Sequence, residues 1–255
     1  MRVLFGAAKA QFQMTRGNIE DLFPILTVPF FAVIFLAIVK QAGRPDLFPN
    51  ALVAPALVAL WSMSLFVSGE LVDRDRWGQI LEPVVAAPAA FPLIVLARVA
   101  TVSSIGVLGF AESWLVAWAV FGVRIAVYHP AVFVAALVAS TFAAVCTALV
   151  MSSVFALGRT ARVFQNSLSY PFYLLGGILV PAAYLPWFLQ PLSKLVFLSW
   201  VADLLRDSLR PSPISGVAPR LSMVILLGCT GLGLGWYLLT RMVDHLRQKG
   251  SLGLT

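Results

Sequence analysis

Charged residues are scarce in this sequence: they make up 11% of its 255 residues, whereas 60% of the residues are hydrophobic. A soluble domain of this length carries about a quarter charged residues, so the composition excludes an ordinary soluble protein. The scarcity also leaves long apolar runs uninterrupted, and runs of about 18 or more residues are typical of membrane-spanning helices. The sequence therefore predicts an all-α integral membrane protein.

Cysteine and histidine are also rare, with two residues of each type. Cys146 and Cys229 lie within apolar runs, where cysteine usually packs as a small hydrophobic residue. His129 and His245 lie outside the predicted spans. A membrane-embedded hydrolase or transferase needs clustered nucleophilic or ionisable groups at membrane depth, and this distribution argues against one. We therefore expect no catalytic residue, no metal site and no cofactor in this chain.

Six apolar segments are predicted to span the membrane, within one domain that covers residues 1–255. They are Phe23–Val39, Ala51–Ser68, Pro92–Phe121, Ala131–Leu157, Leu168–Val180 and Leu221–Thr240. The third segment is long for a single span. Splitting it at Glu112 would give a seventh span and would move Arg159 and Arg162 to the opposite side of the membrane. We therefore predict one long helix that tilts, kinks or projects beyond the bilayer.

The basic residues that flank these segments predict the orientation. Ten of them fall on the side that holds both termini, and six fall on the opposite side. Because basic residues accumulate in cytoplasmic loops, we expect cytoplasmic termini in a multi-pass protein of the cell membrane. The net charge of +7 then comes from basic residues in the segments that flank the spans, so we expect lipids but no nucleic acid as partners.

The N-terminal residues 1–22 are predicted to form an amphipathic helix on the membrane surface. Four basic or polar residues fall on one side when the segment is wound as a helix. They are Arg2, Lys9, Gln13 and Arg16. A narrow basic stripe favours contact with an anionic leaflet, and an ordinary charged tail is the alternative.

A second unusual segment covers residues 181–210, on the outer side of the predicted topology. Its apolar pieces are too short to cross a bilayer, and Pro181 and Pro186 interrupt it. Gly176 and Gly177 precede it and allow the fifth span to break. We predict outer re-entrant or interfacial helices, held by protein or water because lipid cannot satisfy irregular backbone.

A polar island interrupts the apolar chain at residues 70–82, where six of thirteen positions are charged. Glu70 and Arg74 stand four residues apart with the acid first, which is the favourable order on a helix. Asp73 and Arg76 stand three apart. These spacings predict a short charged helix between the second and third spans.

The same island carries a large aromatic side chain. Trp77, Ile80 and Leu81 share one face at helical spacing, and Pro83 is expected to end the helix at about Glu82. The island is either a solvated connector or a docking element for a cytoplasmic partner. A connector needs neither this much charge nor an exposed tryptophan, so docking is favoured.

The island resembles the cytoplasmic loop of type-2 ABC transporter permeases of the drug and natural-product exporter branch. The stretch DRDRWGQILEPVVAAPAAFPLIVLARV is similar in its charged residues, a glycine, a Leu-Glu pair and an Ala-Pro turn. These are Asp73–Arg76, Gly78, Leu81–Glu82 and Ala87–Pro88. The later stretch GGILVPAAYLPWFLQPLSKLVFLSWVADLLR is similar to the family's segment after the fifth span. Gln79 and Pro83 depart from the family pattern, which often has Thr or Ser and a second Leu there.

The resemblance implies that residues 70–82 form a coupling helix, which docks on a separate nucleotide-binding subunit. The residues it implicates are Asp73, Arg74, Asp75, Arg76, Trp77, Gly78, Gln79, Leu81 and Glu82. This chain has no Gly-x-x-x-x-Gly-Lys-Ser/Thr loop, which is the usual cradle for a nucleoside triphosphate. ATP and magnesium are therefore expected in two partner ATPase subunits, beside a second permease that is identical or homologous.

Few residues within the spans suggest a transport pathway. Glu112 is an acidic residue in an apolar span, and such residues face a cavity or a partner by default. A contact with cargo and a structural pair with Arg124 both remain open. Arg98 is expected to reach the headgroups from the base of the same span. Gly231 and Gly235 have the spacing that permits close helix packing, within the chain or between two copies.

The apolar character of the predicted pathway favours an amphipathic drug, a natural product or a lipid-like cargo. A lipid-linked polysaccharide is the alternative cargo. A proton-coupled carrier or channel would need several buried charges, so it is the weaker alternative.

Overall fold

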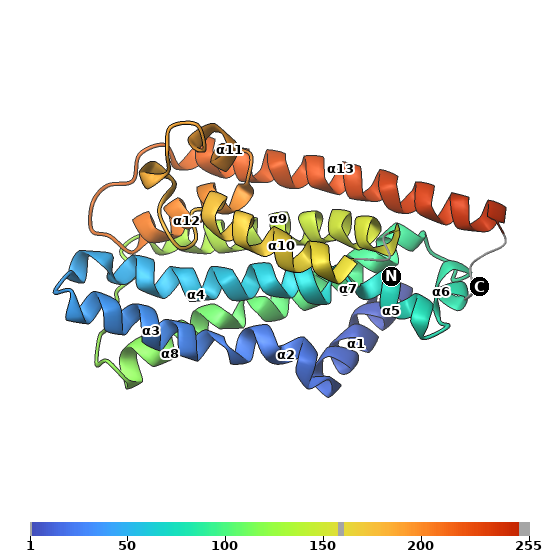
Figure 1. Ribbon diagram of the computed structural model, residues 1–255, viewed down its shortest axis with the longest axis horizontal. Helices are drawn as coiled ribbons and strands as arrows, with labels where there is room; N and C mark the ends of the chain where they lie inside the picture. The colour runs from blue at the N-terminus through green and yellow to red at the C-terminus, as the bar shows by residue number, and fades with distance from the viewer. Residues whose placement is uncertain (1, 158–160, 250–255) are drawn as a thin grey trace.

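Long helices that run along one axis build the chain (Figure 1). The computed structural model describes residues 2–157 and 161–249, and every regular element within those ranges is a helix. Arg159 and the side chain of Arg162 lie outside the described residues. Five stretches are long and apolar enough to cross a membrane: Ile19–Gln41, Pro45–Trp77, Phe91–Ala119, Pro130–Ala156 and Val217–His245. The prediction of an all-α integral membrane protein is confirmed.

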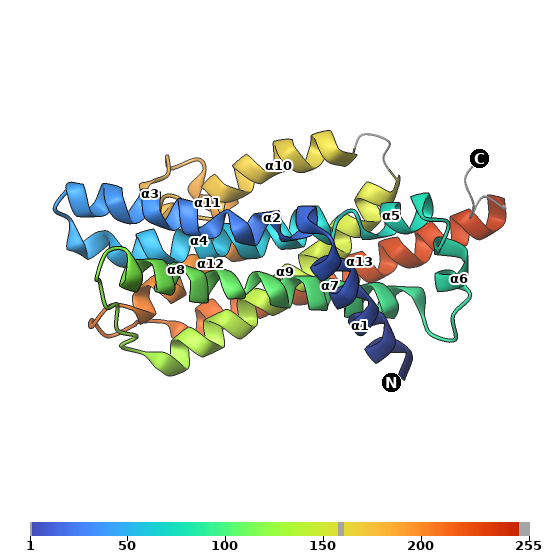
Figure 2. The ribbon, with the colours of Figure 1, turned by 90° about the horizontal axis from the view of Figure 1, so that it is seen from below.

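Two ends of the bundle can be told apart. We call the end that carries α5 (Leu71–Trp77) and α6 (Leu81–Val85) the basal end, and the end that carries α11 (Gln190–Lys194) the distal end (Figure 1). Helix α1 (Arg2–Gly17) crosses the bundle obliquely near the basal end (Figure 2). It ends before Asn18, whose side chain caps the next helix, so the N-terminal helix is shorter than the predicted 1–22.

The first spanning stretch is interrupted where its prolines lie. Helix α2 (Ile19–Leu26) contains Pro24, and α3 (Val28–Gln41) has Pro29 in its first turn. A proline removes one helical hydrogen bond and is tolerated best at a helix start. The stretch therefore changes direction between α2 and α3 without ending.

The third spanning stretch is one long helix with a break, as predicted. Helices α7 (Phe91–Gly106) and α8 (Leu108–Ala119) meet at Val107 and not at Glu112. A Cβ atom added to Gly106 would lie 3.0 Å from the backbone of Leu60 in the second stretch. The missing side chain therefore permits the two stretches to cross closely.

The second spanning stretch forms the centre of the bundle, since 89% of the residues in its most apolar part are buried. It begins with η1 (Pro45–Leu47), continues as α4 (Phe48–Ser62) and widens into a π-helix, η2 (Met63–Val67). A π-helix leaves backbone groups without their regular partners. The side-chain nitrogen of Gln165 donates to the carbonyl oxygen of Leu65 at 3.2 Å, which satisfies one of them.

The prediction of a sixth spanning helix is not confirmed. Helix α10 (Ala161–Leu175) has 15 residues, or about 22 Å, against about 30 Å for the hydrocarbon core. The predicted span Leu168–Val180 is cut short because Gly177 adopts a left-handed φ of 63°. The guanidinium of Arg206 then donates to the carbonyl oxygens of Gly177 and Ile178 at 2.6 and 2.7 Å, and burial lowers the Arg206 pKa to about 10.

Residues 181–210 form short helices, as expected. Pro181 precedes η3 (Ala182–Tyr184), and Pro186 lies in the exposed turn that leads to α11. Helix α12 (Phe197–Ser208) then packs against α4, α9 and α13 (Figure 1). The segment folds back onto the bundle and does not cross it.

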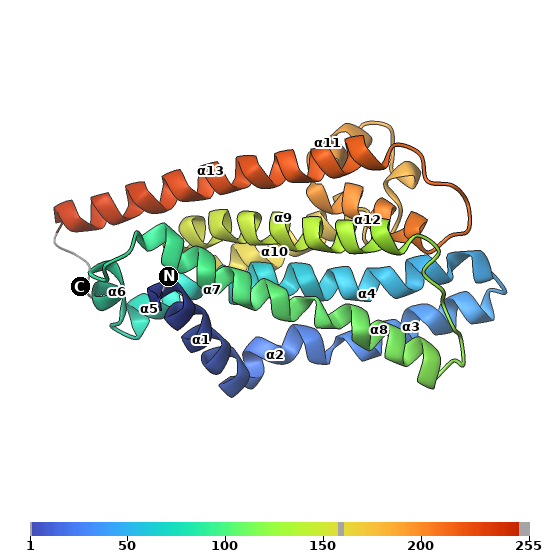
Figure 3. The same cartoon turned by 180° about the vertical axis from the view of Figure 1, so that it is seen from behind.

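The last two spanning helices, α9 (Pro130–Leu157) and α13 (Val217–Lys249), lie side by side (Figure 3). Gly231 and Gly235 both face α9 within the same chain. A Cβ on Gly235 would lie 3.0 Å from the backbone nitrogen of Val150, whereas one on Gly231 would meet nothing closer than 3.5 Å. This glycine spacing therefore serves packing inside the subunit.

Candidate docking loop and its polar anchors

Helix α5 ends in a left-handed turn. The helix predicted to reach Glu82 ends at Trp77, and Gln79 adopts a φ of 56°. The amide of Ile80 donates to the carbonyl oxygen of Asp75 at 2.9 Å, which is the bond that closes a Schellman cap. The chain reverses here, before Pro83 is reached.

The reversal exposes a compact set of residues at the basal end, which we call the tip. The tip consists of Trp77, Gly78, Gln79, Ile80 and Glu82. The side chain of Trp77 is 70% exposed and that of Ile80 is 37% exposed, whereas Leu81 is buried. The prediction that these three residues share one face is wrong for Leu81, because the turn at Gln79 rotates its side chain inward.

Glu70 with Arg74 and Asp73 with Arg76 have spacings that suit ion pairs on a helix, and the first of these pairs forms. A side-chain nitrogen of Arg74 lies 3.2 Å from a carboxylate oxygen of Glu70. The pair between Asp73 and Arg76 is absent from the described part of the chain. Asp73 is partly exposed, and Arg76 donates to the backbone carbonyl of Ala156 at 3.1 Å.

Three successive residues of α5 bind three different spanning stretches. A guanidinium nitrogen of Arg74 lies 2.5 Å from a carboxylate oxygen of Asp21 on α2. Asp75 pairs with Arg98 on α7, and Arg76 reaches the end of α9. Arg74, Asp75 and Arg76, three of the charged residues that the sequence suggested for docking, therefore bind the bundle, whereas Glu82 stays exposed. They fix α5 to the bundle while the tip remains outside.

Arg98 is the centre of a buried polar chain. It was expected to reach the lipid headgroups, and this expectation is wrong: its exposed fraction is 7%. Its Nε donates to the side-chain oxygen of Gln11 at 2.9 Å, and a terminal nitrogen donates to Asp75. The amide nitrogen of Gln11 donates in turn to the hydroxyl of Thr15 at 3.0 Å. A buried charge needs such partners, and α1 and α5 supply them.

Glu112 lies apart from this cluster, on α8. Its side chain is partly buried, and its Oε2 has no hydrogen-bond partner within the part of the chain that the structure describes. No ion pair joins it to Arg124 in that part. The structure thus leaves this carboxylate without the structural partner that the sequence suggested.

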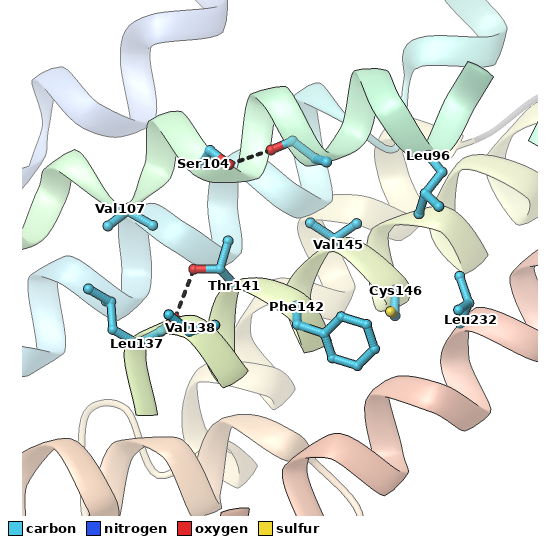
Figure 4. Close-up of a pocket in the computed structure, with 11 residues that line it drawn as sticks. Leu96, Ser104, Val107, Leu137, Val138, Thr141, Phe142, Val145, Cys146 and Leu232 are labelled. Carbon is cyan, nitrogen blue, oxygen red and sulfur yellow. Dashed lines mark hydrogen bonds between the residues drawn. The ribbon is translucent and has the colours of Figure 1, made fainter. Parts of the chain in front are cut away.

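An open cavity of about 590 Å³ lies between α7, α9 and α13. Its walls are almost entirely apolar, and the residues that line it include Leu96, Phe142 and Leu232 (Figure 4). The hydroxyls of Ser104 and Thr141 donate to carbonyls of their own helices at 2.7 and 2.9 Å. The cavity therefore suits apolar groups, because these hydroxyls are already bonded.

The apolar spanning helices, and a loop that is anchored to the bundle by buried charges and exposed at its tip, define an integral membrane protein with an accessible surface at its basal end. The family model described as ABC-2 type transporter matches residues 7–209, which include α5, the tip and the short distal helices. The chain therefore belongs to the ABC-2 type transporter family, and it is a permease of that family. A comparison with curated proteins found no match. Proteins of this family generally work with ATPase subunits.

Proposed function

We propose that this chain is the transmembrane subunit of an ATP-driven exporter in the cytoplasmic membrane. In this proposal the basal end and both termini face the cytoplasm, because α10 and the short helices after it return the chain toward the distal end before α13 begins (Figure 1). ATP is hydrolysed by a separate subunit, because the sequence lacks the phosphate-binding loop that such an enzyme needs. Two permeases and two ATPase subunits would form the working complex.

The tip is the proposed contact with the ATPase subunit. The observation that carries this assignment is the contrast between Trp77, which is 70% exposed, and the buried Asp75 two residues earlier. Large aromatic side chains often dominate the energy of protein interfaces. An exposed tryptophan on a firmly anchored loop is well suited to such a contact.

We further propose an amphipathic cargo: a drug, a natural product or a lipid-like molecule. The apolar walls of the cavity between α7, α9 and α13 support this choice. Apolar sites with few polar groups favour hydrophobic ligands. The partly buried Glu112 is the candidate contact for a cationic group on that cargo.

Co-purification from the native host tests the docking proposal. Trp77→Ala and Ile80→Asp should lose the ATPase subunit, whereas Trp187→Ala should retain it. Trp187 is a matched control, because it is 84% exposed and follows η3 near the distal end. The proposal is contradicted if no ATPase accompanies the wild-type chain, or if all three variants retain it equally.

A further inference from the structure

Helix α1 turns two polar side chains, Gln11 and Thr15, toward the protein, while its basic residues and its aromatic side chains are exposed. Gln11 and Thr15 are buried, with exposed fractions of 2% and 0%, while Phe5 and Phe12 are 74% and 47% exposed. A surface helix held only by apolar contact would bury the opposite face. The inward polar ridge of α1 is explained by Arg98, which Gln11 binds.

The guanidinium of Arg98 binds α1 and α5 simultaneously. Its Nε donates a hydrogen bond to Gln11, and one of its terminal nitrogens donates to Asp75. The donors of a guanidinium lie in a rigid planar fork, so the two partners are held at a fixed relative direction. Arg98 thereby joins Asp75, which lies 23 positions away in the sequence, to Gln11, which lies 87 positions away. Three elements, α1, α5 and the base of α7, therefore form one unit.

The pairing of Asp75 also determines where the tip points. Two residues along a helix correspond to a rotation of about 200°, so Asp75 and Trp77 lie on opposite faces of α5. Holding Asp75 inward keeps Trp77 outward, as their exposed fractions of 2% and 70% show. A rotation of α5 would move both side chains together.

We propose that Arg98, with Gln11 and Asp75, is a positioning residue that couples the tip to α7 and α1. This inference rests on the proposed function. Buried ion pairs add little stability over apolar packing. The pair of Asp75 and Arg98 is therefore better explained by the orientation it gives to α5 than by a contribution to stability. Movement of the tip by a partner would be transmitted through Arg98 to the third spanning stretch and to the surface helix.

The test replaces the pair without leaving a lone charge. The double variant Asp75→Leu/Arg98→Met removes both charges, and such replacements often preserve stability. The matched control is Asp207→Leu/Arg220→Met, which removes the ion pair of 2.6 Å between Asp207 and Arg220, outside the basal end. Both variants are reconstituted with the ATPase subunit in vesicles of phosphatidylethanolamine and phosphatidylglycerol.

Three quantities are measured: the melting temperature, the affinity for the ATPase subunit, and the stimulation of ATP hydrolysis over the free subunit. We expect Asp75→Leu/Arg98→Met to melt at or above the wild-type temperature and to bind within about twofold of wild type. Its stimulation should fall by about tenfold, because misplaced groups lose the productive geometry. The control should keep full stimulation.

Full stimulation in Asp75→Leu/Arg98→Met would overturn the positioning role. If that variant does not fold, Gln11→Leu tests the same unit, because it releases α1 while the pair of Asp75 and Arg98 remains. It should reduce stimulation while binding is retained, and unchanged stimulation would overturn the inference. Failure of the wild-type chain to bind any ATPase subunit would instead contradict the proposed function.

Discussion

Alanine substitutions at three glycines of α13 should change stability in opposite directions, according to the space that each glycine leaves. Gly233 has open space around its Cα, Gly231 would place a Cβ in ordinary contact at 3.5 Å, and Gly235 would place one 3.0 Å from the backbone nitrogen of Val150. Replacing a helical glycine by alanine gains about 0.5–1 kcal/mol. Overpacking against groups that cannot move costs about 1–3 kcal/mol.

The balance at Gly235 differs from that at the other two positions. Gly233→Ala should stabilise the protein by about 0.5–1 kcal/mol, and Gly231→Ala should do the same, because its contacts are normal. At Gly235 the neighbour is backbone of α9, which must shift, so we expect a net loss of about 1–2 kcal/mol. Gly235→Ala should therefore differ from each of the other two variants by about 1.5–3 kcal/mol.

Thermal unfolding of the detergent-purified variants measures this order. One kcal/mol corresponds to about 2–4 °C in a chain of this size, so the difference is well resolved. Size-exclusion chromatography of each variant checks that the oligomeric state is unchanged. If Gly235→Ala is as stable as Gly233→Ala, the close packing of α13 on α9 is refuted.

Three further substitutions test other parts of the structure. Arg206→Lys should lower the free energy of unfolding by about 1–3 kcal/mol, since an ammonium cannot reproduce the fork that binds the carbonyls after α10; thermal unfolding measures it. Gln165→Leu should cost about 1–3 kcal/mol by leaving the carbonyl of Leu65 unpaired, and an unchanged melting temperature would contradict that bond. Glu112→Gln should not destabilise the protein, because no partner is lost; a lower melting temperature would reveal one.

Local patterns located five spanning stretches, although the predicted span Leu168–Val180 is not among them. The first predicted span, Phe23–Val39, lies within the observed stretch Ile19–Gln41, because apolar composition alone determines which residues can enter a bilayer. The long third span was likewise recognised as one helix, although its break at Val107 depends on a crossing with α4 that no local pattern records.

The predictions that failed depend on contacts between distant residues. Arg98 has the spacing of a residue that reaches the headgroups, but its partners Asp75 and Gln11 come from other helices. The left-handed turn falls on Gln79 although Gly78 precedes it, so glycine preference places it one residue early. The docking role of the tip is untested by these observations and stays a prediction.

Photo-crosslinking at position 77 tests the central claim most directly. A photoreactive phenylalanine analogue replaces Trp77 in cells of the native host, and the same analogue replaces Trp187 as the distal control. We predict that position 77 captures a protein with a Gly-x-x-x-x-Gly-Lys-Ser/Thr loop, identified by mass spectrometry, and that position 187 does not. Capture of lipid alone at position 77, or of the same ATPase at both positions, would contradict docking through the tip.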